Sequence, residues 1–152
     1  MSSSSEHLAS SHLAEPLLGT WKMRAWTFED LVSEEQRDAL GPHPCGYITY
    51  TPDGRVMVLV VARERARPAN LVPTNEEKIA LYDTMFAYAG KFDFDGTKVV
   101  HHIDVSWNEA WRGSSQIRFC ELHDDVLTYV SAPARNPMTG RDCVHTVVFE
   151  RL

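Results

Sequence analysis

The chain has 152 residues, of which 43% are hydrophobic and 24% charged, and its formal net charge is −6. This length favours one domain with a substantial core, and the composition is that of a folded protein rather than a disordered one. The acidic balance argues against nucleic-acid binding, which needs clustered Lys and Arg. No apolar run is long enough to cross a membrane.

The N-terminal residues 1–12 are rich in serine, and we expect a mobile tail followed by a single domain over residues 13–152. The tail lacks the basic and apolar segments of a secretory signal, so a cytoplasmic protein is expected. The three cysteines, Cys45, Cys120 and Cys143, have neither an even number nor a CxxC spacing. We therefore expect reduced thiols rather than disulfides or a zinc site.

The first predicted strand covers residues 19–28, which are rich in Trp, Met, Thr and Phe. After it, the Ser-Glu-Glu-Gln sequence at residues 33–36 fits a capping box. This pattern predicts a short helix that runs to Leu40 and ends before Gly41.

Residues 47–51 and 55–62 are the next two predicted strands. They flank Pro52, Asp53 and Gly54, and this triplet has a physical reason to turn. Proline fixes φ, and glycine accepts a positive φ, so the two strands are predicted to form a hairpin.

A second capping box begins at Thr74 and predicts the main helix of the chain, over residues 75–89. Ile79, Tyr82, Met85 and Phe86 recur at helical spacing. We expect this face of the helix to pack on the rest of the domain.

The remaining segments alternate between strand and turn patterns, and the predicted strands cover residues 91–94, 98–107, 114–122, 126–131 and 143–151. Strands joined by short turns pair antiparallel. Eight such strands favour an all-β fold, an eight-stranded antiparallel barrel with one helix inserted between the third and fourth strands. A barrel of this size has room for side chains or for one small ligand.

Several short motifs in this order resemble the bacterial and fungal lipocalin-like domain family. They include Leu18-Gly19-Thr20-Trp21, residues 46–54, Trp111-Arg112-Gly113 and Phe149-Glu150-Arg151. The resemblance implies a calycin-type barrel in which Trp21 closes the bottom and Arg151 lies across its ring. Related barrels include passive carriers and cofactor-free isomerases and cyclases. The insert between Asp30 and Gly41 departs from a minimal lipocalin and would add a flap over one end.

Two adjacent histidines, His101 and His102, lie on one predicted strand and therefore point to opposite faces. They cannot both bind one metal ion from regular strand geometry, and no metal or other cofactor is expected. One of the two imidazoles should face the interior, and the alternation alone leaves open which one.

The strand at residues 114–122 is equally ambiguous, because Arg118 and Ile117 occupy opposite faces and either face fits the interior. The family resemblance favours Arg118 and His102 as interior groups. Arg118 would then bind or polarise a ligand oxygen, and His102 would donate or accept a proton. Asp104 would orient His102 or pair with Arg118.

The further candidates for ligand contact are Tyr50, Met57, Trp111, Tyr129 and His145. The first hypothesis is a barrel that binds a small hydrophobic or amphipathic metabolite in a secondary-metabolite pathway. The second is a cofactor-independent isomerase or cyclase that folds its substrate in the lumen and polarises a carbonyl group. The third is a filled barrel that serves as an interaction domain, and the sequence leaves open whether the chain is a monomer or a homodimer.

Overall fold

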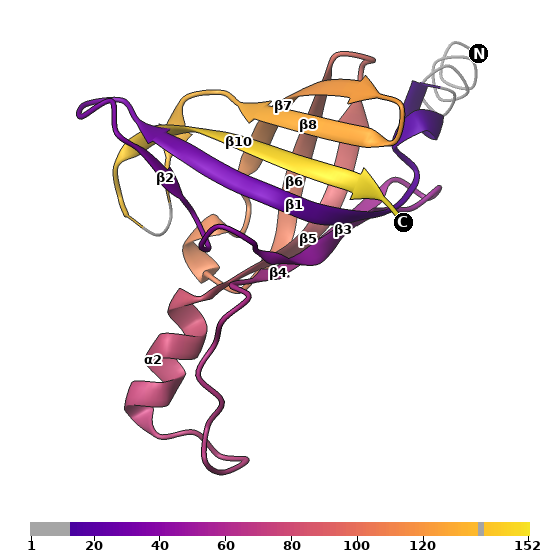
Figure 1. Ribbon diagram of the computed structural model, residues 1–152. Helices are drawn as coiled ribbons and strands as arrows, with labels where there is room; N and C mark the ends of the chain where they lie inside the picture. Colours follow the sequence, from indigo (N-terminus) through magenta and orange to yellow (C-terminus); the bar gives the residue numbers. More distant parts are fainter. Residues whose placement is uncertain (1–12, 137–138) are drawn as a thin grey trace.

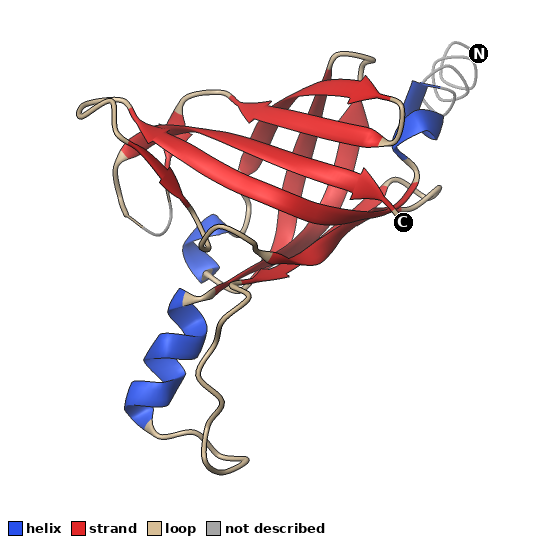
Figure 2. Ribbon diagram, viewed as in Figure 1, coloured by secondary structure: helices blue, strands red, loops and turns tan. Residues whose placement is uncertain are grey.

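The computed structural model describes residues 13–136 and 139–152 and shows a closed antiparallel β-barrel (Figures 1 and 2). The barrel wall consists of β1 (Gly19–Asp30), β3 (Cys45–Tyr50), β4 (Arg55–Val61), β5 (Met85–Phe94), β6 (Lys98–Ser106), β7 (Ser115–His123), β8 (Val126–Ser131) and β10 (Asp142–Arg151). Each strand pairs with the next in this order, and β10 pairs with β1 to close the ring. The predicted eight-stranded barrel is confirmed. The predicted N-terminal tail, residues 1–12, lies outside the described residues.

Two short strands extend this ring. β2 (Gln36–Asp38) pairs with β1, and β9 (Ala134–Arg135) pairs with β10. Both belong to long connections rather than to the barrel wall.

The two ends of the barrel differ in the length of their connections. Residues 51–54, 95–97 and 124–125 form tight turns at one end, which we call the hairpin end. At Gly54 the turn takes φ = 82°, a value that glycine adopts without strain. The other end, which we call the loop end, carries all the long connections: residues 31–44, 62–84, 107–114 and 132–141.

The hairpin end is closed by a short 3₁₀ helix, η1 (Glu15–Leu17), and by the last residues of β10. Trp21 is fully buried there, and its Nε1 donates to the carbonyl oxygen of Leu17 at 2.9 Å. The guanidinium carbon of Arg151 lies 4.1 Å from the centre of the Trp21 ring. Arg151 also donates to the carbonyl oxygens of Leu18 and Pro16. This is the arrangement expected for Trp21 and Arg151, and it fixes η1 across the barrel floor.

The prediction of a short helix after the first strand is wrong. The carboxylate of Asp30 accepts hydrogen bonds from the backbone of Val32 and Ser33, and Glu34 takes a positive φ of 58°. These contacts turn the chain back on itself, and it then pairs with β1 as β2. A capping box is a local pattern, and here the turn at Asp30 and the pairing with β1 outweigh it.

The main helix lies between β4 and β5, the third and fourth strands of the wall, as predicted, but it is shorter. α2 (Asn75–Asp83) begins with the predicted capping box, in which Thr74 and Glu77 each bond the other's backbone N–H. The chain then leaves the helix, and Phe86 lies on β5. Residues 85–90 also alternate with period two, and as a strand they pair with β4, while residues 88–90 pair with β6 as well.

The expected packing of this helix on the barrel is also wrong. α2 and the loop before it project away from the barrel wall (Figure 1), and no residue of the helix is buried. The side chain of Ile79 is 62% exposed. The apolar residues that seemed to continue the helical face, Met85 and Phe86, belong to the barrel wall instead.

The contact between β5 and β6 requires a glycine. A Cβ on Gly90 would lie 1.9 Å from the carbonyl oxygen of His102. The register between the two strands shifts at this point, because Ala89 pairs with Val105 while Gly90 pairs with Ile103. The bulge turns β6 beyond Ile103, and Val105 is exposed on the outer surface.

Candidate functional site

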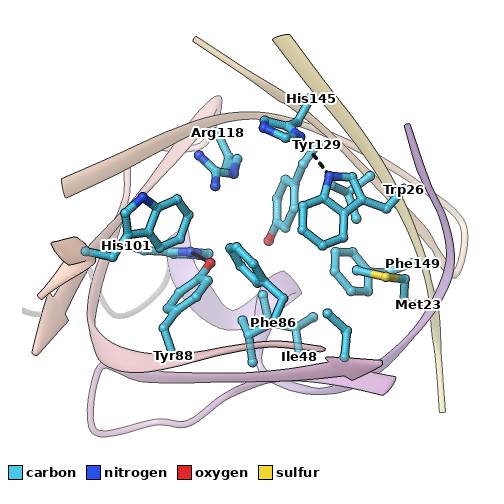
Figure 3. A pocket seen from close by; sticks show the side chains of 14 residues that line it. Met23, Trp26, Ile48, Phe86, Tyr88, His101, Arg118, Tyr129, His145 and Phe149 are labelled. Carbon is cyan, nitrogen blue, oxygen red and sulfur yellow. Dashed lines mark hydrogen bonds between the residues drawn. The ribbon is translucent and has the colours of Figure 1, made fainter. Parts of the chain in front are cut away.

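The lumen of the barrel contains a cavity, whose lining side chains Figure 3 shows from close by. Its volume is about 40 Å³, which exceeds the ~10–15 Å³ that one water molecule requires. Most of its wall is apolar or aromatic, and it is lined by Met23, Trp26, Ile48, Val58, Val60, Phe86, Tyr88, His101, Trp111, Arg118, Tyr129, His145, Val147 and Phe149.

Arg118 places a positive charge in this cavity. It lies on β7 opposite Val99 and Ser131, its residue is only 9% exposed, and its guanidinium points into the space between the other labelled side chains (Figure 3). Its Nη1 donates to the carbonyl oxygen of Ile117 at 3.2 Å. Among the residues that the structure describes, no carboxylate lies within 4.0 Å of it. The lumen therefore holds a guanidinium to which the described residues supply no counter-charge.

The acidic partner suggested for Arg118 lies elsewhere. Asp104 is on the outer surface, where its Oδ2 lies 3.1 Å from Nη1 of Arg55. It follows the inward-facing Ile103 on β6 and therefore points outward, so it does not reach Arg118, and the bonds of His102 go to Asp93 and Ser115 instead.

The interior histidine is His101, and the prediction that His102 faces the lumen is wrong. His101 is 1% exposed, and it shares the inner face of β6 with Val99 and Ile103. His102 lies outside, with Nε2 2.8 Å from Oδ2 of Asp93 and Nδ1 3.0 Å from Oγ of Ser115. The proton-transfer role predicted for His102 in the lumen therefore has no support from its position.

A buried chain of hydrogen bonds runs through His101. The Oη of Tyr88 lies 2.6 Å from its Nδ1, and the Oη of Tyr50 lies 2.7 Å from its Nε2. Tyr50 in turn lies 2.5 Å from the Oη of Tyr129. Burial raises the pKa of Tyr88 to about 12 and also raises the pKa values of Tyr50 and Tyr129. Burial, and then the charge of Arg118, lowers the pKa of His101 well below its usual value, so all four groups are neutral.

This chain of hydrogen bonds contains one more donor hydrogen than its three bonds use. Three hydroxyls and one neutral imidazole carry four hydrogens for three bonds. If Tyr50 donates to Tyr129, then His101 donates to Tyr50 and the spare hydrogen is on Tyr129. If Tyr50 donates to His101, the spare hydrogen is on Tyr88. Both end tyrosines line the cavity, so either arrangement leaves a donor at its wall.

His145 is held in one protonation state by its neighbours. Its Nδ1 lies 2.8 Å from Nε1 of Trp26, which can only donate, so this Nδ1 carries no hydrogen. The hydrogen of the neutral ring is then on Nε2, which faces the Sγ of Cys143 at 3.2 Å. Burial, and then Arg118, lowers the pKa of His145 to about 4. Because Nε2 already bears a hydrogen, His145 cannot act as the base that would activate Cys143.

Aromatic side chains pack where the cavity meets the loop end. Phe86 is at their centre, with ring centroids 4.8 Å from Trp26, 4.4 Å from Trp107 and 4.9 Å from Trp111. Trp26 comes from β1, and Trp111 comes from η2 (Glu109–Trp111) in the connection between β6 and β7. These rings cover the loop-end side of the cavity.

The family model described as a lipocalin-like domain matches residues 18–152, nearly the whole chain. The chain belongs to the lipocalin-like domain family. A search of curated proteins found no relative that matches it. The match confirms the family that the short motifs resemble, and a lipocalin-like barrel is in general a ligand-binding fold. Within residues 13–136 and 139–152, no helix has the length and apolar character needed to cross a membrane.

The predicted ligand contacts of the lipocalin-like barrel fall into three groups. Trp111, Tyr129 and His145 line the cavity. Tyr50 lies behind the lining, in the hydrogen-bonded chain. Met57 is 64% exposed on the outer face of β4, so its assignment to the lumen is wrong. The inner face of that strand holds Val56, Val58 and Val60 instead.

The predicted site residues omit ten of the fourteen residues that line the cavity of the lipocalin-like barrel, among them Trp26, Phe86, Tyr88 and His101. For Phe86 and Tyr88 a signal was present, because they alternate with Gly90 at period two. It was hidden by the helical spacing from Tyr82 to Phe86. For Trp26 the signal was its place on the same face of the first strand as Phe28, since both side chains are buried.

Proposed function

We propose that this lipocalin-like barrel binds one small, mostly apolar molecule in its lumen, within a small-molecule pathway. The observation that supports this most directly is the cavity. Its wall is apolar apart from a few polar groups that converge on it, as in most small-molecule sites. A barrel whose interior was filled only for stability would not need a buried guanidinium there.

The size of the cavity limits the ligand. The cavity volume is about 40 Å³, whereas the whole space between the lining atoms, including the opening to solvent, is about 490 Å³. A molecule of a few carbon atoms fits the present geometry. A larger one requires Phe86 and its aromatic neighbours at the loop end to move.

Six-carbon probes that differ only in their head group provide the test: hexan-1-ol, hexanamide and hexanoate. Binding is measured by titration calorimetry and by the fluorescence of Trp26 and Trp111, which both line the cavity. Native mass spectrometry of freshly purified protein looks for a retained molecule in parallel. At least one probe should bind.

Two variants of β10 form a matched pair for this test. Val147 faces the lumen and Val148 does not. Val147→Phe should fill the cavity and abolish probe binding, while Val148→Phe should leave it unchanged. If no probe binds and no molecule is retained, or if both variants lose binding equally, the proposed function is wrong.

The alternative of a cofactor-independent isomerase or cyclase gains support from one observation, the spare hydroxyl hydrogen of the chain from Tyr88 to Tyr129. Such a donor at the cavity wall suits a reaction that polarises a carbonyl group. A molecule recovered from the lumen would be incubated with the protein and followed by NMR. If the protein converts this molecule, and if Tyr88→Phe abolishes the conversion but still binds the molecule, the result would favour an enzyme over a carrier.

A further inference from the structure

We infer that the molecule bound in the lumen is a monocarboxylate whose carboxylate group pairs with Arg118; this inference rests on the proposed ligand-binding function. Arg118 is nine-tenths buried and points into the cavity. A guanidinium has five N–H donors, and only one bond to a described residue, the one to Ile117, uses them. The remaining donors have room for a ligand.

The charges around the cavity show why the ligand should be an anion. The fourteen lining residues include no Asp, Glu or Lys. The two lining histidines are neutral, because burial and Arg118 lower the pKa values of His101 and His145. Arg118 therefore gives the described lumen a net charge of one. A buried charge is costly unless it is paired, and an anionic ligand would supply the missing partner.

A carboxylate fits this site better than the other oxygen anions. The planar guanidinium matches the two oxygens of a carboxylate through parallel hydrogen bonds. One carboxylate also balances one positive charge, whereas a phosphate monoester carries about −1.5 to −2 charges at pH 7. A neutral carbonyl would accept a hydrogen bond but leave the guanidinium unbalanced.

A second polar contact is available beside Arg118. The spare hydrogen of the tyrosine–histidine chain sits on Tyr88 or on Tyr129, and both line the same cavity. When the spare hydrogen is on Tyr88, no described residue accepts it. When it is on Tyr129, that hydroxyl faces the thiol of Cys120, which is a weak acceptor. A carboxylate oxygen would be a better acceptor than either alternative, and the rest of the wall suits an apolar tail.

The experiment compares hexanoate with hexan-1-ol and hexanamide on the wild-type protein at pH 7.5, with sodium chloride, sodium phosphate and sodium acetate as further ligands. Hexanoate should bind at least tenfold more tightly than the two neutral probes. Chloride and phosphate should bind far more weakly than hexanoate, and acetate should fall between them because it lacks the apolar tail.

Arg118→Met and Arg112→Met make the matched pair of variants. Arg112 is an exposed arginine that pairs with Glu109 at the loop end, outside the cavity lining. Arg118→Met should lose at least tenfold in hexanoate affinity and keep or gain affinity for hexan-1-ol. Arg112→Met should behave like the wild type. Circular dichroism and a melting curve check that each variant is folded.

The outcomes separate the two proposals. Neutral probes that bind as tightly as hexanoate would overturn the carboxylate inference and leave the proposed function standing. Chloride or phosphate binding as tightly as hexanoate would also overturn it, because the site would then select charge without an apolar tail. If no six-carbon probe binds, the proposed function fails. Should Arg118→Met not fold, the wild-type ranking of hexanoate, hexanamide and hexan-1-ol still decides the question.

Discussion

At the scale of single residues, Arg118 is the side chain most closely connected to the proposed function. Hydrophobic residues surround its side chain, and the described lumen offers it no carboxylate. A buried guanidinium in this setting does not stabilise an empty barrel, because the attraction that would repay its lost hydration is missing. The proposed anionic ligand would account for its position, whereas the stability of the empty barrel does not.

Replacing Arg118 with methionine should therefore stabilise the ligand-free protein. We expect the free energy of unfolding to rise by about 1–2 kcal/mol, since the change removes an unpaired buried charge and keeps most of the side-chain volume. Urea denaturation at pH 7.5 measures this. The exposed Arg112→Met should change the same quantity by less than ~0.5 kcal/mol. A clear loss of stability in Arg118→Met would show that its contacts are structural.

A second residue-scale prediction concerns the closure at the hairpin end. Arg151 lies over the ring of Trp21 and donates to the carbonyl oxygens of Leu18 and Pro16. Arg151→Met should lower the free energy of unfolding by about 2 kcal/mol, combining a cation–π contact with two charge-assisted hydrogen bonds. The measurement is a urea titration followed by Trp fluorescence. Arg24→Met removes an exposed pair with Glu150 and should have almost no effect.

At the scale of elements, α2 and β5 differ sharply although they are adjacent in the chain. α2 has no buried residue and projects from the barrel, whereas β5 pairs with β4 and β6 along its length. Nine residues are too few for a helix that is stable by itself in water. The capping box at Thr74 thus contributes to local order but little to the stability of the barrel.

Substitutions on these two elements should have very different effects. Phe86→Ala should lower the free energy of unfolding by about 3–5 kcal/mol, because it removes a buried ring and leaves a cavity. Ile79→Ser, in the exposed helix, should change it by less than ~0.5 kcal/mol. Differential scanning calorimetry compares the two variants with the wild type. A large effect of Ile79→Ser would mean that α2 is packed against another part of this chain and that Ile79 is not exposed.

At the scale of the whole molecule, two buried histidines link stability to pH. His101 and His145 are neutral in the folded protein, because burial lowers the pKa of His145 to about 4 and that of His101 well below its ordinary value of 6.5. Below pH 6.5 the unfolded chain takes up protons on both side chains and the folded chain does not. Stability is therefore highest above pH 6.5 and falls as the pH falls from 6.5 towards 4.

Each histidine should contribute about 1.4 kcal/mol per pH unit within this window. Urea denaturation at pH 7.5, 6.0 and 5.0 measures the slope, and His145→Gln should remove about half of it between pH 6 and 5. Val147→Ala, which destabilises the same wall without removing a titratable group, should keep the full slope. An unchanged slope in His145→Gln would show that this side chain is protonated in the folded state.

Much of the fold could be predicted because it rests on local chemistry. The Pro52-Asp53-Gly54 turn, the valine-rich strand segment at residues 55–62 and the motif around Trp21 each point to a barrel without reference to distant residues. The length of α2 was harder to predict from the sequence. The segment from Tyr82 to Phe86 fits helical spacing and strand alternation equally well, and only the pairing of Met85 and Phe86 with β4 distinguishes the two.

The sequence by itself determined that either His101 or His102, and either Arg118 or Ile117, would face the lumen. It did not determine which, because each strand carries polar and apolar residues on both faces. The tertiary structure decided both at once. Val99 lies opposite Arg118, and His101 lies opposite Gln116. Residues directly opposite in an antiparallel pair share a face, so Arg118 must share the lumen with His101 and cannot share it with His102.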